Sequence, residues 1–165
     1  MGAVIRPMQA ADVDAIVELS LRAWEPVFAS IRATVGDRLF AYFYDGDWRV
    51  HQANDVRRAC SDYDVLVAED GVRVIGFTAV DVSREGDEGE IYMIAVDPGA
   101  QQKGVGSQLT QAAVDQIRAA GKRVAVVGTG GDPGHAPARA TYRKAGFVPW
   151  PSEQFYLLLD GDESD

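Results

Sequence analysis

Residues Glu90–Ser107 read EIYMIAVDPGAQQKGVGS, and this stretch decides the fold class. Its apolar run Ile91–Val96 predicts a buried strand, and the Asp-Pro pair that follows predicts a turn. The next segment, about Gly104–Ala120, carries apolar residues at helical spacing and begins with two glycines, Gly104 and Gly106. A strand therefore leads through a short loop into a glycine-rich helix start.

A helix start of this kind is suited to binding phosphate. The first backbone amides of a helix lack partners inside the helix, and the helix dipole adds partial positive charge there. Glycine at positions 104 and 106 removes side chains that would hold a phosphate away, and Lys103 adds a full positive charge. Taken alone, the glycine pair is equally typical of a tight turn. The sequence does not contain the Walker pattern, and the dinucleotide fingerprint needs a third glycine that is missing here.

The remaining elements surround this segment in an order typical of a mixed α/β sheet. The turn Asp70-Gly71 between two apolar runs indicates a hairpin. The expected strands are Ala3–Arg6, Asp64–Glu69, Val72–Val82, Ile91–Val96, Arg123–Val127 and a final pair around Phe147–Val148 and Phe155–Leu159; the expected helices are Ala10–Trp24, a broken helical region Pro26–Ser61, Gly104–Ala120 and Ala136–Lys144.

Composition narrows the class of protein. The 165 residues fit one domain, residues 1–159, followed by an acidic tail at 160–165. A formal net charge of -9 disfavours nucleic acid and anionic membranes as partners. Cys60 is the only cysteine, which excludes an internal disulfide and a cysteine-rich metal site, and we expect no metal. No apolar run approaches membrane-span length and no signal segment opens the chain, so we expect a cytoplasmic protein; a homodimer is compatible with the sequence.

Two motifs resemble one known family. Gln101-x-x-Gly104-x-Gly106, after the strand end, is similar to the acyl-CoA loop of the GNAT acetyltransferase superfamily. Downstream, the segment from Ala138 through Tyr142 to Gly146-Phe147 resembles that superfamily's A-x-x-x-Y-x-K-x-G-F segment. The resemblance implies a central, mostly antiparallel sheet of about seven strands flanked by helices, splayed between the fourth and fifth strands.

The resemblance also implies acetyl-CoA as cosubstrate and a set of residues that hold it. Pantetheine is expected to pair with backbone near Ile94 and Val96, and the pyrophosphate to sit on amides of the loop. Lys103, Arg143 or Lys144 are candidates for the outer phosphates. The expected cofactor-binding residues are Ile94, Ala95, Val96, Gln101, Gln102, Lys103, Gly104, Val105, Gly106 and Ser107.

Amine acetylation needs a base for the attacking nitrogen, stabilisation of the oxyanion and a proton donor for the leaving thiolate. Tyr142 matches the tyrosine that commonly acts as general acid in the superfamily, and a backbone amide near Ile94 or Ala95 is the implied oxyanion donor. Two residues compete for the base. Glu90 begins the central strand, where strand alternation places it on one face with Tyr92, Ile94 and Val96. His135 lies in the loop before the last predicted helix, and histidine is the residue type that most often serves as a general base.

One position departs from the family pattern. Where many relatives carry an asparagine after the strand that ends at Val127, this chain has Thr129. We consider Thr129 as a replacement for that asparagine, with loss of a pantetheine contact as the alternative.

We expect the acceptor to be a small cationic amine; a protein amino terminus or lysine, and a regulatory module that binds acyl-CoA without turnover, remain open. The residues considered for cation attraction are Asp45, Asp47, Glu85, Asp87 and Glu88. A set of aromatic residues has two interpretations: the rings pack in the core, or some of them line an acceptor pocket. The set is Phe28, Phe40, Tyr42, Phe43, Tyr44 and Trp48.

Overall fold

The computed structural model describes residues 2–159 and builds them around one mixed sheet. Its strand order is β1-β2-β3-β4-β5, antiparallel as far as β4 and parallel between β4 and β5. The strands are β1 (Val4–Pro7), β2 (Asp64–Asp70), β3 (Arg73–Asp81), β4 (Glu88–Val96) and β5 (Val124–Val127). The predicted fold class, a mostly antiparallel mixed sheet, is confirmed, with five strands in place of about seven.

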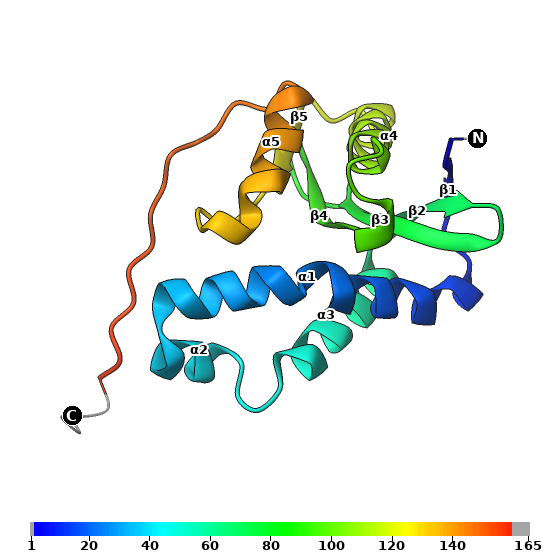
Figure 1. Ribbon diagram of the computed structural model, residues 1–165. Coiled ribbons are helices and arrows are strands. Elements are labelled where there is room, and N and C mark those ends of the chain that lie inside the picture. The colour runs from blue at the N-terminus through cyan, green and yellow to red at the C-terminus, as the bar shows by residue number, and fades with distance from the viewer. Residues whose placement is uncertain (1, 160–165) are drawn as a thin grey trace.

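Helices cover both faces of the sheet (Figure 1). One face packs against α1 and α3, and the other packs against α4. The helices are α1 (Val13–Val35), α2 (Asp37–Phe43), α3 (Trp48–Asp62), α4 (Val105–Ala119) and α5 (Ala136–Lys144), with short 3₁₀ turns η1 (Ala10–Asp12), η2 (Pro98–Ala100) and η3 (Pro133–His135). Among the helices of residues 2–159, none combines the length and apolar character that crossing a membrane requires.

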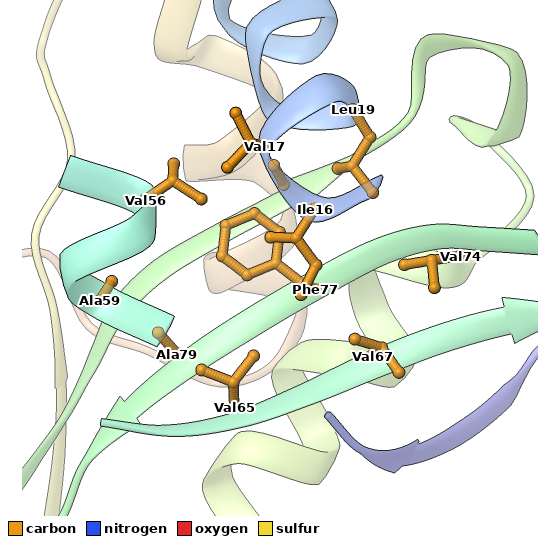
Figure 2. Packing of buried hydrophobic residues seen from close by; sticks show 11 residues of the cluster. Ile16, Val17, Leu19, Val56, Ala59, Val65, Val67, Val74, Phe77 and Ala79 are labelled. Carbon is orange, nitrogen blue, oxygen red and sulfur yellow. The ribbon is translucent and has the colours of Figure 1, made fainter. Parts of the chain in front are cut away.

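The main core lies between the sheet and the pair α1 and α3. Phe77 of β3 is fully buried at its centre, between Ile16 of α1 and Val56 of α3 (Figure 2). Burying one such side chain contributes about 1.5–3 kcal/mol relative to leaving it in water. This packing fixes the position of α1, which later forms one wall of the candidate site.

On the opposite face α4 approaches the strands very closely. A Cβ at position 76 would lie 2.9 Å from Cδ1 of Leu109, and one at position 89 would lie 2.8 Å from Cγ2 of Ile117. Glycine at both positions therefore lets the helix sit directly on β3 and β4. The N-terminus of α4 is thus held against the end of β4 by core packing.

One predicted helix end and one predicted strand pair are wrong. The helix expected to end at Trp24 continues to Val35, although Pro26 lies inside it and removes one backbone donor. Beyond that point Phe28 stacks on Trp48 of α3 and Ser30 bonds to Asp132 beside η3, and these tertiary contacts hold the rest of the helix. The final strand pair, Phe147–Val148 and Phe155–Leu159, does not form. Phe147 still packs on the body, and from Val148 on the chain runs along the outside of the molecule toward α2 (Figure 1). The acidic tail at 160–165 lies outside the described residues.

The sheet opens between β4 and β5, as predicted. The two strands pair from Glu88 with Val124 to Ile91 with Val127, and β4 then continues to Val96 without β5 beside it. The edge of β4 that points into this splay is therefore free of strand pairing.

A bulge in β4 lies just beyond the last pair. Ile91 is opposite Val80 and Met93 is opposite Ala79, so that Tyr92 is an extra residue. The bulge interrupts the side-chain alternation: Tyr92 contacts Tyr63 at the end of α3, whereas Ile94 and Val96 pack toward α4. The expectation that Glu90 shares a face with Ile94 and Val96 is therefore wrong.

Candidate functional site

A cavity of about 550 Å³ lies at the splay. Its walls come from α1, the end of β4, the start of α4, η3 and α5. The predicted site residues on these walls are Ile94, Ala95, Val96, Gln101, Gln102, Gly104, Gly106, Ser107, His135 and Tyr142. Among the described residues, three of the predicted set do not line it: Val105, the first residue of α4, is buried against the sheet, and Lys103 and Glu90 lie elsewhere.

The start of α4 forms an open cradle of backbone. Gly104 precedes the helix with φ of 83° and ψ of 0°, a left-handed conformation that favours glycine. A Cβ at position 106 would meet only Cγ2 of Val96, at 3.8 Å, so the space above this amide is free. No side chain caps the helix, and its first amides are available to an anion.

Asp97 stabilises the turn between β4 and the start of α4, a role that the sequence analysis did not predict. Its Oδ1 accepts the Gly99 amide at 3.0 Å, and its Oδ2 accepts the Arg22 guanidinium at 2.6 Å. The side chain is 6% exposed, and burial raises its pKa. The hydrogen bonds from Arg22 and Gly99, together with the positive charges of Arg22 and Arg73, outweigh burial and leave the pKa of Asp97 below its usual value.

The polar side chains around the loop differ in what they reach. Gln101 donates its amide to the Val96 carbonyl at 3.1 Å, which ties the loop to the end of β4. Lys103 donates to the Gly99 carbonyl at 3.0 Å and is exposed. Of the basic residues predicted near the outer phosphates, only Lys144 lines the cavity among the described residues.

Tyr142 projects from α5 to the cavity wall and is 7% exposed. Its ring packs edge-on against Phe147, with centroids 6.0 Å apart. Burial raises the pKa of Tyr142 to about 12, so the phenol stays protonated at neutral pH. Within residues 2–159 its hydroxyl has no hydrogen-bond partner, which leaves it available as a donor.

His135 lies on the same wall, at the end of η3. Its Nδ1 contacts Oδ1 of Asp132, and Oδ2 of Asp132 accepts the Ser30 hydroxyl at 2.7 Å. Burial raises the pKa of Asp132, but the contacts, chiefly those with Ser30 and His135, lower it by more. The pKa of Asp132 is therefore below its usual value. Neither Ser30 nor Asp132 was predicted; the spacing of Asp132 three residues before His135 is the one signal the sequence offers.

The other candidates lie away from the cavity. Glu90 is 28% exposed and forms an ion pair with Arg84 at 2.6 Å. Thr129 is exposed, and in the described chain it does not line the cavity. Thus neither side chain lines the cavity that Tyr142 and His135 line.

The aromatic and acidic sets also form contacts elsewhere. Phe28 stacks on Trp48 with centroids 4.2 Å apart, which supports packing for that pair. Asp47 caps α3 by accepting the Arg49 amide, and Asp87 pairs with Arg123. No member of either set lines the cavity described here; its aromatic wall on α1 is Trp24.

Comparison with known proteins identifies the family. The chain matches the model of the Acetyltransferase (GNAT) family over residues 18–147. It is 35% identical, over 147 residues, to mycothiol acetyltransferase of Amycolatopsis mediterranei (strain U-32); the match covers 83% of this chain and 43% of that protein. The chain spans less than half the length of the curated relatives it matches.

Solved structures agree with the fold. The paia N-acetyltransferase of Thermoplasma acidophilum, in complex with coenzyme A, superposes with a TM-score of 0.67 at 18% identity, covering 93% of this chain and 94% of that one. The yncA protein of Salmonella typhimurium, with its cofactor acetyl-CoA, gives a TM-score of 0.60 at 25% identity, covering 90% and 80%. Because the family model spans most of the chain and the splayed sheet agrees with it, this protein belongs to the acetyltransferase (GNAT) family.

Proposed function

We propose that the protein is an acetyl-CoA-dependent N-acetyltransferase that acetylates a small primary amine by direct attack in a ternary complex. One observation carries the proposal: a single cavity joins the uncapped start of α4, the free edge of β4, Tyr142 and His135. Acyl transfer from a CoA thioester requires a site for the phosphates, a donor to the leaving sulfur and a base. The helix start, the protonated phenol and the imidazole suit these three roles.

The residues present suit acetyl-CoA. The amides that open α4, with free space above Gly106, would hold the pyrophosphate, and Lys144 would supply positive charge. The β4 edge beyond Ile91 would pair with the pantetheine amides, because β5 has diverged from it there. A volume of about 550 Å³ lies within the usual range for a small-molecule site.

When bound, acetyl-CoA supplies a thioester whose acetyl group the amine takes directly, forming a C–N bond as the C–S bond breaks. His135 accepts the proton that the attacking nitrogen loses. A β4 amide near Ile94 or Ala95 stabilises the negative charge that develops on the carbonyl oxygen. No covalent attachment to the protein is needed.

Tyr142 acts chiefly as a hydrogen-bond donor to the leaving sulfur. Its pKa of about 12 lies well above the value of about 8.5 for an ordinary thiol, so complete proton transfer to the thiolate is uphill. A donated hydrogen bond nevertheless stabilises the charge that builds on sulfur, and in a site shielded from water this stabilisation is larger than in bulk solvent. The same high pKa keeps the donor protonated across the physiological range.

We favour His135 over Glu90 as the base. His135 is on the cavity wall with Tyr142, whereas Glu90 is held by Arg84 outside it. A base must come within hydrogen-bond reach of the amine, and position is therefore the first criterion.

For the acceptor we propose a small molecule that packs its carbon skeleton on α1. Ala23, Trp24, Pro26 and Val27 form an apolar wall, and no carboxylate of the described residues lines the cavity. The net charge of -9 attracts cations to the molecule as a whole, but only a primary amine is needed in the cavity itself. A panel of spermidine, an aminoglycoside, glucosamine and a lysine peptide, followed by free-thiol release, identifies the class.

Tyr142→Phe tests the chemistry. We expect kcat to fall about 100-fold because the donor to sulfur is lost, while the dissociation constant for CoA changes less than about threefold. Turnover is measured by thiol release and binding by calorimetry. Tyr42→Phe is the matched control, since Tyr42 is 69% exposed and distant from the cavity wall. Unchanged turnover in Tyr142→Phe would remove this residue from the mechanism, and absence of CoA binding by the wild type would end the proposal.

A further inference from the structure

We propose that Ser30 and Asp132 are positioning residues that fix the His135 imidazole in the tautomer able to accept a proton from the amine. This inference rests on the proposed function, because it says which residues hold His135, the base proposed for acetyl transfer, in its working form. It goes beyond the family match, which identifies neither residue. Ser30 lies on α1 and Asp132 in the loop before α5, 102 positions apart in the chain.

The contacts form a continuous chain from the helix to the cavity. The Ser30 hydroxyl donates to Oδ2 of Asp132 at 2.7 Å, and Oδ1 of the same carboxylate meets Nδ1 of His135. The Gly134 amide adds a bond to Oδ2 at 3.0 Å. The Asp132 side chain is 9% exposed and that of His135 is 20% exposed. A carboxylate with several donors and little water around it has one geometry available.

The charge on Asp132 decides the tautomer. Its pKa is lowered overall, and the group is therefore an ionised acceptor at neutral pH. A carboxylate at Nδ1 requires the proton of the neutral imidazole to reside on Nδ1, which leaves the lone pair on Nε2. His135 lines the cavity, and Nε2 is the nitrogen left for the acceptor amine. The arrangement has the logic of an aspartate that orients a histidine base in hydrolases.

The glycines of the loop are required by these contacts. A Cβ at position 130 would lie 2.5 Å from both Oδ1 of Asp132 and Nδ1 of His135. A Cβ at position 134 would lie 2.7 Å from Cβ of Ser30. Neither glycine has positive φ, so the need is for space around the chain and not for an unusual backbone. Any side chain at 130 would force apart the two groups that the proposal joins.

A second element holds the loop from the other side. Arg139 of α5 donates to the carbonyls of Gly130 and Asp132, at 2.5 and 2.9 Å. The loop is thus tied to α1 through Ser30 and to α5 through Arg139. Such double anchoring is the support that a precisely placed base needs, because a misplacement of about 1 Å costs on the order of 100-fold in rate.

Asp132 also caps η3, and a purely structural role for these contacts makes different predictions. In Asp132→Asn the side chain keeps its size but loses the charge that fixes the tautomer. We expect kcat to fall about 100-fold, with the KM for the amine and the dissociation constant for CoA within about threefold of wild type. Nitrogen NMR should show the Nδ1–H form of His135 in the wild type and a mixture in the variant.

Two further variants separate the role of Ser30 from general damage. Ser30→Ala should lower kcat about tenfold, since it removes one of the donors to Asp132. Thr34→Ala is the matched control one turn along α1, because the Thr34 hydroxyl donates only to the Ser30 carbonyl at 2.9 Å; we expect wild-type kcat. His51, the other histidine, is removed in a His51→Gln background so that the NMR signals belong to His135 alone.

The outcomes distinguish this inference from the proposed function. Inactive His135→Gln together with fully active Asp132→Asn would overturn the positioning role and leave His135 as base. An Nε2–H tautomer in the wild type would also overturn it. Full activity in His135→Gln would instead refute the base assigned under the proposed function. A loss of kcat and of CoA affinity together in Asp132→Asn would show a structural role and overturn the positioning role.

Discussion

Gly104 and Gly106 are two residues apart, yet glycine serves a different purpose at each. Gly104 has φ of 83°, where any other residue is strained, whereas Gly106 has ordinary helical backbone and free space above its amide. Gly106 therefore contributes room for a ligand, and Gly104 contributes a backbone turn. The two roles are separable because only the first depends on what binds.

Gly106→Val is expected to weaken CoA binding at least about tenfold, because a branched side chain above the amide holds the pyrophosphate away. The midpoint of thermal unfolding should be equal or higher, since valine is a better helix residue than glycine. Calorimetry and thermal unfolding check the two parts. Gln108→Val, an exposed change on the next part of α4, should retain wild-type affinity. Wild-type affinity in Gly106→Val would contradict the assigned cradle.

Local pattern predicted the cradle but not the support for His135. The glycines of the α4 loop, Tyr142 and His135 are visible because each stands in a motif or a loop of recognisable composition. The contact from Ser30 to Asp132 joins residues 102 positions apart, and nothing in the helix around Ser30 marks one serine as different. Such a pairing depends on how α1 docks, which is a tertiary property.

At the scale of elements, one ionic cluster joins β1, η1 and β2. Arg6 of β1 donates to Asp12 at 2.7 Å and to Glu69 at 2.9 Å, and Asp12 also accepts the Gln9 amide. The hydrogen bond from Arg6 is the largest cause that lowers the pKa of Asp12; burial raises it by less. The cluster fixes where α1 begins relative to the sheet.

Asp12→Asn should lower the free energy of unfolding at pH 7 by about 1–3 kcal/mol, because a nearly buried charged pair is broken. A carboxylate whose pKa is depressed in the folded state stabilises the fold above its unfolded value of about 3.9. That contribution is lost as pH falls through the folded pKa. The difference between wild type and variant should therefore shrink below about pH 4, as urea unfolding at pH 7 and pH 3 measures.

The matched control is Asp14→Asn. Asp14 pairs with Arg57 at 3.0 Å but is 82% exposed, and we expect less than about 0.5 kcal/mol from its loss. Equal effects of the two substitutions would show that the cluster around Arg6 adds nothing beyond a surface ion pair.

Element boundaries were the part of the fold that sequence reasoning placed least well. Pro26 predicts a helix end from local chemistry alone, but tertiary contacts carry α1 on to Val35. The bulge at Tyr92 has no glycine or proline to reveal it, and it moves Ile94 and Val96 to the opposite face of the sheet from Glu90. Helix and strand type, in contrast, follow from periodicity and were correct as far as α5.

The C-terminal segment, residues 148–159, is the main feature at the scale of the whole molecule. Most of its side chains are apolar and exposed, with Trp150 at 90% and Phe155 at 89%. The segment runs along the outside of the molecule (Figure 1), and the Tyr156 ring packs against Phe43. Strand β5 lies at one end of the described sheet, with one edge unpaired. An apolar extended segment and a free strand edge in one molecule complement each other between two copies.

We therefore predict that the protein forms a dimer in which this segment of one copy adds to β5 of the other. Light scattering after size exclusion should give twice the chain mass of 17.8 kDa at micromolar concentration. The double variant Trp150→Ser with Phe155→Ser should be monomeric and still unfold cooperatively, because neither side chain belongs to the core. Its midpoint should no longer depend on protein concentration, since the contribution of association is lost. Val72→Ser is the control: Val72 is 99% exposed but isolated, and its loss should leave the dimer intact. A wild type that stays monomeric at these concentrations would refute the prediction, because the segment would then not pair with β5 of a second copy.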